Sequence, residues 1–207
     1  MYSDIFIQKC KRVIIAVAGA DRSSFNHAFT DNIKTFIYEN PDDTVHVIQG
    51  WTFYNNNELM NAIINMSHKV GGIDSLVIES HATSNVLSII PRTDTGARLW
   101  LTPSDNWGGI NFHEHANIRF TGCNAGGNNG IASPSSIAQQ VANQTQRIVL
   151  AFVNNTSQIG RDAPGNIVGD WRKASSFRQE PVQMFWMQKV VRHYTRFCPA
   201  MPLKESL

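Results

Sequence analysis

The chain has 207 residues, of which 42% are hydrophobic and 16% are charged, and its formal net charge is +2 at pH 7. This balance is typical of a soluble globular domain with one sizeable core and excludes a disordered chain. Lysine and arginine are scattered without forming a basic stripe, so nucleic-acid binding has no support. No apolar run approaches the roughly 20 residues that span a bilayer, so no membrane segment is expected.

The three cysteines are Cys10, Cys123 and Cys198. An odd and sparse count argues against a disulfide framework and fits a reducing compartment, or a protein that keeps one thiol for chemistry. Basic residues precede the apolar run 13–17, and residues 18–20 resemble a signal-peptide cleavage site. We interpret the run as a buried strand instead, because a helix pattern that needs this strand for packing follows directly. The expected location is cytoplasmic, or exported without a cleaved signal peptide.

The first part of the chain alternates between β-branched apolar runs and segments with apolar residues at helical spacing. We predict, in chain order, a strand over 12–19, a helix through the apolar positions of 25–37, a strand over 44–50, a helix through 59–66 and a strand over 75–81. Stop signals support both helices, since Asn40-Pro41 follows the first helix and Gly71-Gly72 follows the second.

The pattern changes after residue 81. Residues 85–90 and 98–101 predict a hairpin with its turn around 93–96, and residues 117–122 predict a fourth core strand. Ser133-Pro134-Ser135 can cap a helix whose apolar face includes Ile137 and Val141. Residues 147–153 predict a fifth core strand, residues 154–180 are expected to be largely loop, and a last helix is expected to begin at Pro181.

Strands that alternate with helices predict an α/β fold with a mostly parallel central sheet, covered by helices on both faces. No internal repeat or linker divides the chain, so one domain is expected. Functional groups in such sheets lie beyond the carboxyl ends of the strands, where the loops leave the rigid core.

Two residues suited to chemistry lie at that edge of the predicted sheet. His81 ends the third predicted strand and Cys123 ends the fourth core strand. If these strands are neighbours, the two side chains converge. A cysteine nucleophile needs such a partner, because the thiolate is the reactive form and a nearby imidazole favours it or protonates the leaving group.

The pattern resembles a known clan of cysteine peptidases that includes caspases, legumains, gingipains, clostripain and separase. The nearer resemblance is to an uncharacterised caspase-like domain of bacterial surface proteins, including large adhesin-like ones. That domain carries Ser-His-Gly, Tyr-Gly-Cys-Asn and a later Gly-Asp-Trp. This chain has Ser80-His81-Ala82, Thr121-Gly122-Cys123-Asn124 and Gly169-Asp170-Trp171, and the resemblance covers roughly residues 12–172.

The resemblance implies a caspase-like three-layer sandwich with a hairpin insert and a C-terminal helix, in a single domain of a bacterial protein. The core would span about 12–172, with a helical extension over 173–198 and a tail over 199–207. Cys123 would attack a peptide carbonyl and His81 would protonate the leaving amine. The backbone N–H groups of Ala82 and Cys123 would hold the oxyanion, although the clan usually has glycine at the position of Ala82. The expected partner is a peptide or protein substrate, and no cofactor is expected.

Further residues are candidates for supporting roles. Glu79 lies two residues before His81 on the same strand face and is a candidate to orient the imidazole, or it pairs elsewhere. Trp100 and Trp107 are candidates for a pocket wall or for the core. Candidates for a substrate pocket are Asn124, Asp94, Asp105, Asn154, Asn155 and Arg161. An acidic pocket floor would select lysine or arginine, whereas Arg161 would select aspartate or glutamate.

Two other functional classes stay open. A catalytically inactive caspase-like domain would keep His81 and Cys123 and serve as a binding module, and Ala82 leaves room for that. A zinc site is the other alternative, because His113 and His115 are two residues apart and would face the same way on a strand, with His81 or Cys123 as further ligands. The residues favour a cysteine endopeptidase or a self-processing relative as the function.

Overall fold

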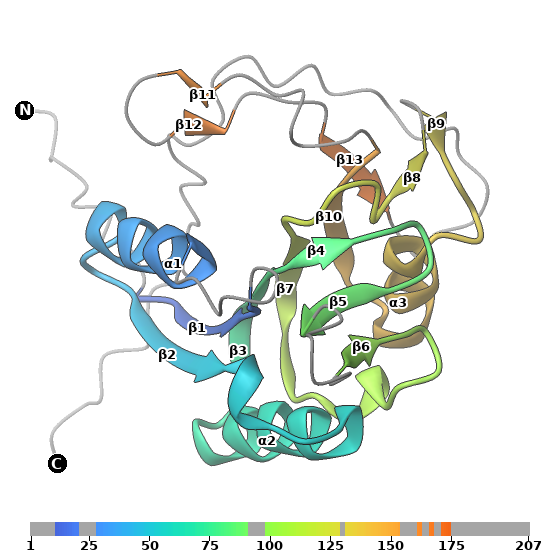
Figure 1. Ribbon diagram of the computed structural model, residues 1–207. Coiled ribbons are helices and arrows are strands. Elements are labelled where there is room, and N and C mark those ends of the chain that lie inside the picture. Colours follow the sequence, from blue (N-terminus) through green and yellow to red (C-terminus); the bar gives the residue numbers. More distant parts are fainter. Residues whose placement is uncertain are drawn as a thin grey trace, which may run out of the picture.

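The computed structural model describes residues 11–20, 28–90, 98–128, 131–153, 161–162, 166–167 and 171–174 (Figure 1). Its longer elements are β1 (Val13–Ala18), α1 (Ala28–Glu39), β2 (Thr44–Gln49), α2 (Asn56–Lys69), β3 (Ile73–Glu79), β7 (Phe112–Phe120), α3 (Ile137–Thr145), β10 (Ile148–Phe152) and β13 (Trp171–Ala174). The shorter ones are β4 (His81–Ala82), β5 (Leu87–Ile90), β6 (Leu99–Leu101), β8 (Gly127–Asn128), β9 (Ile131–Ala132), β11 (Arg161–Asp162), β12 (Asn166–Ile167) and the 3-10 helices η1 (Gly50–Thr52) and η2 (Trp107–Gly109).

The central sheet has six strands in the order β13-β10-β7-β3-β1-β2. The five strands from β10 to β2 are parallel to their neighbours, and β13 pairs with β10 in the antiparallel sense. The predicted α/β fold with about five parallel core strands is therefore confirmed. The apolar run that resembled a signal sequence forms β1, which lies between β2 and β3 and is buried from Ile14 to Ala18.

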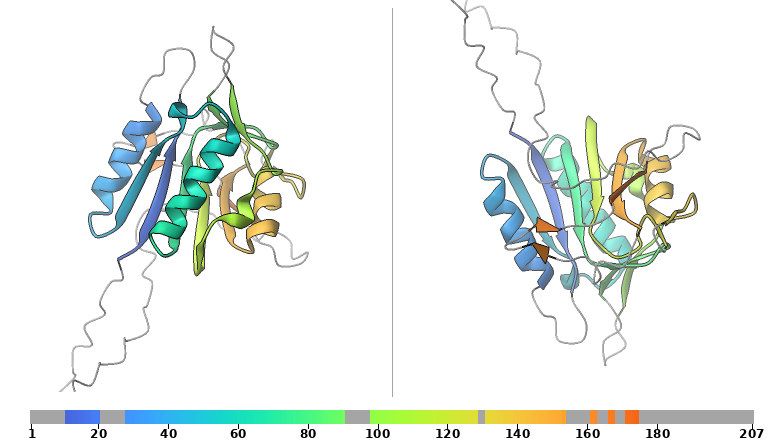
Figure 2. Two further views of the ribbon diagram at one scale, coloured as in Figure 1. Left: turned by 90° about the horizontal axis from the view of Figure 1, so that it is seen from below. Right: turned by 90° about the horizontal axis from the view of Figure 1, so that it is seen from above.

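Helices cover both faces of this sheet (Figure 2). On one face, Ile33 of α1 packs with Ile14, Ala16 and Val77. On the other face, side chains of α2, α3 and the β5–β6 hairpin join one larger apolar cluster with the inward residues of the strands. The alternation along β1 explains the division, since even-numbered side chains point to α1 and odd-numbered ones to α2.

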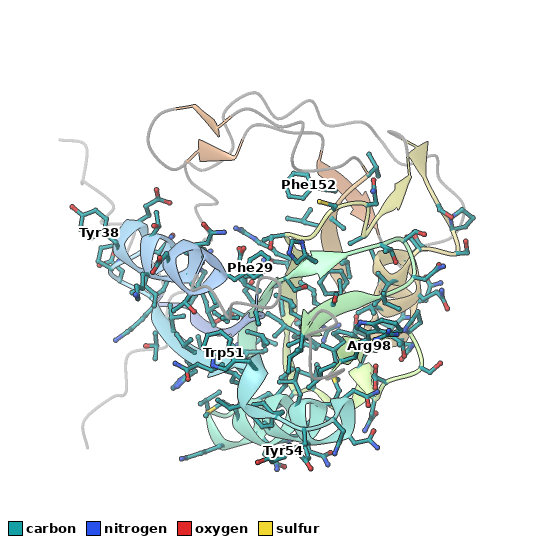
Figure 3. The ribbon with its side chains drawn as sticks, viewed as in Figure 1. Phe29, Tyr38, Trp51, Tyr54, Arg98 and Phe152 are labelled. Carbon is teal, nitrogen blue, oxygen red and sulfur yellow. The ribbon has the colours of Figure 1, made fainter. Side chains whose placement is uncertain are left out.

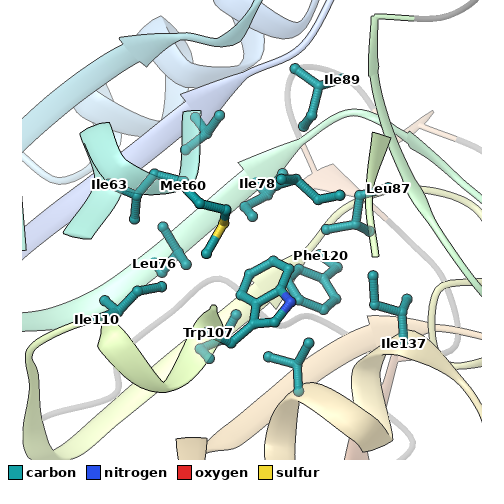
Figure 4. Close-up of a cluster of buried hydrophobic side chains, with 14 of the residues drawn as sticks. Met60, Ile63, Leu76, Ile78, Leu87, Ile89, Trp107, Ile110, Phe120 and Ile137 are labelled. Carbon is teal, nitrogen blue, oxygen red and sulfur yellow. The ribbon is translucent and has the colours of Figure 1, made fainter. Parts of the chain in front are cut away.

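The larger cluster contains Trp107 and Phe120, two of the largest fully buried side chains (Figure 4). Trp107 is fully buried, its ring centroid lies 5.7 Å from that of Phe120, and its indole N–H donates to the carbonyl oxygen of Thr102 at 2.8 Å. Trp107 is therefore a core residue whose indole N–H has a hydrogen-bond acceptor. Of the two roles predicted for it, pocket wall or core, the structure shows the core role.

Side chains and glycine fix the ends of the helices on this face. Asn55 caps α2 by accepting the backbone N–H of Glu58 at 2.9 Å, and Gly71, at φ 80°, follows the end of that helix. The cap of α3 is Ser136, which accepts from the N–H of Gln139 at 3.2 Å. The predicted cap at residues 133–135 was therefore wrong by one position, because only Ser136 directly precedes the first helical turn.

Two predicted strand ends also differ from the structure. β3 ends at Glu79 rather than at His81, and β7 runs from Phe112 to Phe120 rather than over 117–122. The early start of β7 was missed because its first half is partly exposed and carries His113 and His115, so it lacks an apolar run. Both candidate catalytic residues consequently lie just beyond the strands instead of at their last positions.

The predicted hairpin is confirmed as part of a separate three-stranded sheet in the order β4-β5-β6. His81 pairs with Ser88 and Ala82 with Leu87 across β4 and β5, and Leu87 pairs with Leu101 across β5 and β6. This small sheet begins where β3 ends and carries His81, so it belongs to the candidate site.

The segment 154–180 contains more strand than was predicted. Its described parts form β11, β12 and β13, and β13 extends the central sheet beyond β10. The predicted end of the core, at residue 172, falls inside β13. The turn around residues 93–96 and the helix predicted from Pro181 lie outside the described residues. Within the described part of the chain, no helix has the length and apolar character needed to cross a membrane.

Candidate active site

The pairing of β3 with β7 brings His81 and Cys123 to the same edge of the sheet. The last register pair of the two parallel strands is Ile78 with Phe120, and each candidate residue lies three positions further along its own strand direction. The backbone N–H of Thr121 donates to the carbonyl oxygen of Ile78 at 3.1 Å, which extends the contact past the end of β7. The segments that follow β3 and β7 thus leave the sheet side by side (Figure 1).

Gly122 holds the two departing segments in close contact. A Cβ atom added to Gly122 would lie 2.5 Å from the Cβ of Ala82, 2.7 Å from the carbonyl oxygen of Ser80 and 2.8 Å from the backbone nitrogen of Ala82. Real Cβ atoms do not approach heavy atoms so closely, so only glycine fits here. His81 lies between Ser80 and Ala82, and Cys123 follows Gly122, so this contact brings the backbone segments that carry the two candidate residues together.

His81 is held from two sides. Its backbone is paired with Ser88 in the small sheet, and its imidazole meets the ring of Phe29 edge-on, with centroids 5.2 Å apart and an interplanar angle of 84°. Phe29, labelled in Figure 3, comes from the first turn of α1, so the helix on one face of the central sheet supports the imidazole. His81 remains partly exposed, as a residue that exchanges protons with a substrate must be.

Cys123 lies in a tight turn directly after β7, and its side chain is half-buried. Asn124, the next residue, has φ 59° and accepts the N–H of Gly127 through its carbonyl oxygen at 3.0 Å. Asparagine is one of the few residues that adopt this left-handed conformation readily. Two further bonds fix the turn, from the N–H of Gly126 to Phe152 at 2.8 Å and from the N–H of Ala138 to Ala125 at 3.2 Å.

The backbone N–H of Ala82 is directed toward the Cys123 turn. The N–H of Thr83 donates to Val86 at 2.9 Å, which makes that pair a hydrogen-bonded one in the hairpin of β4 and β5. Hydrogen-bonded and non-hydrogen-bonded pairs alternate in antiparallel strands. Ala82 and Leu87 are therefore a non-hydrogen-bonded pair, and the backbone N–H and C=O groups of Ala82 do not bond to β5. The Ala82 N–H therefore points away from β5 toward the side on which Gly122 lies.

Ala82 adopts an ordinary strand conformation. Asn124 and Gln146 are the non-glycine residues with positive φ in the described part of the chain, and Ala82 is not one of them. The conformational freedom of glycine is therefore not needed at position 82. Glycine is needed instead at position 122, where the two segments touch.

Glu79 has hydrogen-bond partners on α1 and on the segment after β7. One carboxylate oxygen accepts the hydroxyl of Thr121 at 2.8 Å and the side-chain amide of Asn32 at 3.4 Å, and the residue is 8% exposed. Glu79 therefore links α1 to the segment that leads into Gly122 and Cys123. Thr121 and Asn32 were missed from the sequence, because neither has a motif that marks it as a partner of a buried carboxylate.

Of the remaining pocket candidates, Asp105 has side-chain partners that the structure describes. Asp105 is buried and accepts from the backbone N–H of Thr102 at 2.6 Å and from the amide of Asn56 at 2.7 Å, which ties the connection after β6 to α2. Arg161 belongs to β11, which pairs with β12. Asp94, Asn154 and Asn155 lie outside the described residues.

The two histidines proposed as zinc ligands lie at the opposite end of β7 from Cys123. His113 is near the start of this strand, where its ring nitrogen Nδ1 lies 3.1 Å from a carboxylate oxygen of Asp74, and His115 is exposed. The register with β3 shifts between Phe112 and Asn117, so the separation is better taken along β3, from Asp74, which contacts His113, to His81. These seven positions correspond to roughly 20 Å at the strand rise of about 3.3 Å per residue. No group of three or more His, Cys, Asp or Glu side chains within the described ranges is placed to hold a metal ion.

Comparison with known proteins adds no family assignment. A scan against protein-family models and a search of curated proteins each found no match to this chain. The functional argument consequently depends on the residues of the site and on the fold that positions them.

Proposed function

We propose that this chain is a cysteine peptidase of caspase-like type, in which Cys123 is the nucleophile and His81 is the general acid. The observation that carries the proposal is the shared register of β3 and β7, which sets both residues three positions beyond one strand pair, with Gly122 packed against Ala82. Thiol peptide hydrolysis requires a thiol and an imidazole within reach of each other, and neighbouring strand extensions can hold them so.

The proposed reaction begins when His81 takes the proton of the Cys123 thiol and the sulfur attacks the carbonyl carbon of the peptide bond. The carbonyl oxygen takes up the negative charge, and the backbone N–H groups of Ala82 and Cys123 donate to it. The carbon–nitrogen bond then breaks as His81 gives a proton to the departing amine. Water hydrolyses the resulting thioester, which releases the acid product and restores the thiol. No cofactor takes part.

The caspase-like assignment of the fold is part of the same proposal. It is supported by the parallel order of β10, β7, β3, β1 and β2, by helices on both faces and by the hairpin that follows the histidine strand. The C-terminal helix that the resemblance implies is proposed to complete the three-layer sandwich. The substrate is a peptide or a protein, which includes a segment of the chain itself in the case of self-processing.

The experiment that tests the proposal is intact-mass labelling of the folded protein with peptidyl acyloxymethyl ketones, which react with activated cysteines. We expect one adduct on the native protein and none on Cys123→Ala, with labelling strongly slowed in His81→Gln. A small alkylating reagent provides the control for accessibility of Cys123. If that reagent modifies Cys123 while no ketone does, the chain is a binding module of the same fold rather than a peptidase.

A further inference from the structure

The small sheet β4-β5-β6 has one buried and one outward face. Leu87 and Leu101 are fully buried in the larger core cluster, and Ala82, which pairs with Leu87, packs against the same cluster. Residues that pair directly across strands lie on the same face, and neighbours along a strand lie on opposite faces. The inner face of this sheet is therefore the row of Ala82, Leu87 and Leu101.

The outward face carries a second row that begins at the candidate active site. His81 pairs with Ser88, and Ser88 pairs with Trp100, so these three residues are aligned across the three strands. His81 and Ser88 are half-buried, and Trp100 is 41% exposed. Neighbouring strands lie about 4.8 Å apart, so the backbone of Trp100 is roughly 10 Å from that of His81.

A stacked cation ends this row. The guanidinium carbon of Arg98 lies 5.3 Å from the ring centroid of Trp100, and Arg98 is exposed (Figure 3). No carboxylate within the described ranges forms an ion pair with Arg98. A guanidinium that stacks on an indole keeps its N–H groups in its own plane, where they can donate to an incoming carboxylate.

We propose that Arg98 and Trp100 form a binding subsite for an acidic side chain of the peptide substrate. The inference rests on the proposed peptidase function, because it takes the bond to be cleaved as lying beside His81 and Cys123. A distance of roughly 10 Å is the span of about three residues of extended peptide. The subsite therefore selects an acidic residue about three positions from the cleaved bond.

An acidic ligand fits this pair better than an apolar one. The face of the Trp100 ring is already occupied by the guanidinium, so the indole presents less apolar surface than a free tryptophan would. Its role is to hold the cation in place, which lowers the conformational entropy that Arg98 loses on pairing. Charge complementarity then comes from Arg98 alone.

The test measures binding in the absence of cleavage. Fluorescence anisotropy follows the binding of labelled ten-residue peptides to Cys123→Ala, with a single glutamate moved through successive positions of an otherwise neutral peptide. We expect one position to tighten binding by up to about fivefold, as for a largely exposed ion pair. This gain should vanish in Arg98→Gln and weaken in Trp100→Ala, whereas Tyr54→Ala, which removes an exposed aromatic residue elsewhere, should keep it.

The outcomes separate this inference from the peptidase proposal. Equal binding of all glutamate positions, or a preference that survives Arg98→Gln, overturns the subsite whether or not the native protein reacts with the ketone probes. A preference that depends on Arg98 supports the subsite. If it occurs in a protein that no ketone labels, the peptidase proposal fails and the row is a peptide-binding surface.

Discussion

Gly122 and Ala82 touch so closely that a Cβ on Gly122 would lie 2.5 Å from the Cβ of Ala82. The contact joins the segment that follows β3, which carries His81, to the segment that follows β7, which carries Cys123. Backbone packing thus holds together the two segments that carry the candidate catalytic residues.

The first prediction concerns this contact. Gly122→Ala should lower the free energy of unfolding by about 1–3 kcal/mol, because the added methyl group overlaps packed backbone atoms. It should also abolish labelling of Cys123 by peptidyl ketones. Urea denaturation and intact mass measure the two effects. Gly108→Ala is the matched control, since the nearest atom to its added Cβ is 4.0 Å away.

Adding Ala82→Gly to the Gly122→Ala protein tests which atoms cause the loss of stability. Ala82→Gly removes the Cβ–Cβ overlap from the Gly122→Ala protein but leaves the carbonyl oxygen of Ser80 and the nitrogen of Ala82 at 2.7 and 2.8 Å. The double variant should therefore regain only part of the lost stability. A Gly122→Ala protein with native stability and native labelling contradicts the close contact.

The sequence predicted the parts of the molecule that depend on apolar pattern. The β1 run and the apolar positions of α2 identified their elements, because burial on a sheet requires those residue types at those spacings. It missed the first half of β7, whose two histidines, one half-buried and one exposed, and exposed glutamate carry no strand signal. In that half Phe112 pairs with Ile73 of β3, and after a register shift the pairing resumes between Asn117 and Ser75. Such a shift is not visible in the order of residues.

Of the candidate site, too, some residues could be predicted from the sequence and others could not. His81 and Cys123 are conspicuous because each follows an apolar strand, and the parallel order of the strands explains why they converge. The partners of Glu79 could not be predicted, since Asn32 comes from α1 on another part of the chain. Phe29 and Trp100 likewise gain their roles from the arrangement of elements and not from a local motif.

The second prediction concerns Glu79 and Thr121. Glu79→Ala should lower the free energy of unfolding by about 1–3 kcal/mol, because the part-buried amide of Asn32 loses its acceptor and the hydroxyl of Thr121 keeps only the carbonyl oxygen of Ile78 at 3.2 Å. Thr121→Val should be destabilising too, and the double variant should be less destabilised than the sum of the single ones. Urea denaturation of all the variants gives this coupling energy. Strict additivity would show that the two side chains do not act together.

The third prediction concerns the support of the imidazole by α1. Phe29→Ala and Phe36→Ala each remove a half-buried ring that packs on the same apolar cluster, so each should lower stability by about 1–2 kcal/mol. Only Phe29 meets the ring of His81 edge-on. Phe29→Ala should therefore also slow ketone labelling of Cys123 by about two- to tenfold, the value of an aromatic edge contact. Equal labelling rates in the two variants would remove Phe29 from the site.

The fourth prediction separates a structural carboxylate from a pocket floor. Asp105→Ala should lower the free energy of unfolding by about 1–3 kcal/mol, because Thr102 and Asn56 lose a buried acceptor. The preferred side chain among the ketone probes should not change, since Asp105 is engaged between α2 and the connection after β6. Asp31→Ala, at an exposed ion pair with Lys34, is the control and should change stability by less than about 1 kcal/mol. If Asp105→Ala instead kept its stability and lost a preference for basic probes, Asp105 would be part of the substrate pocket.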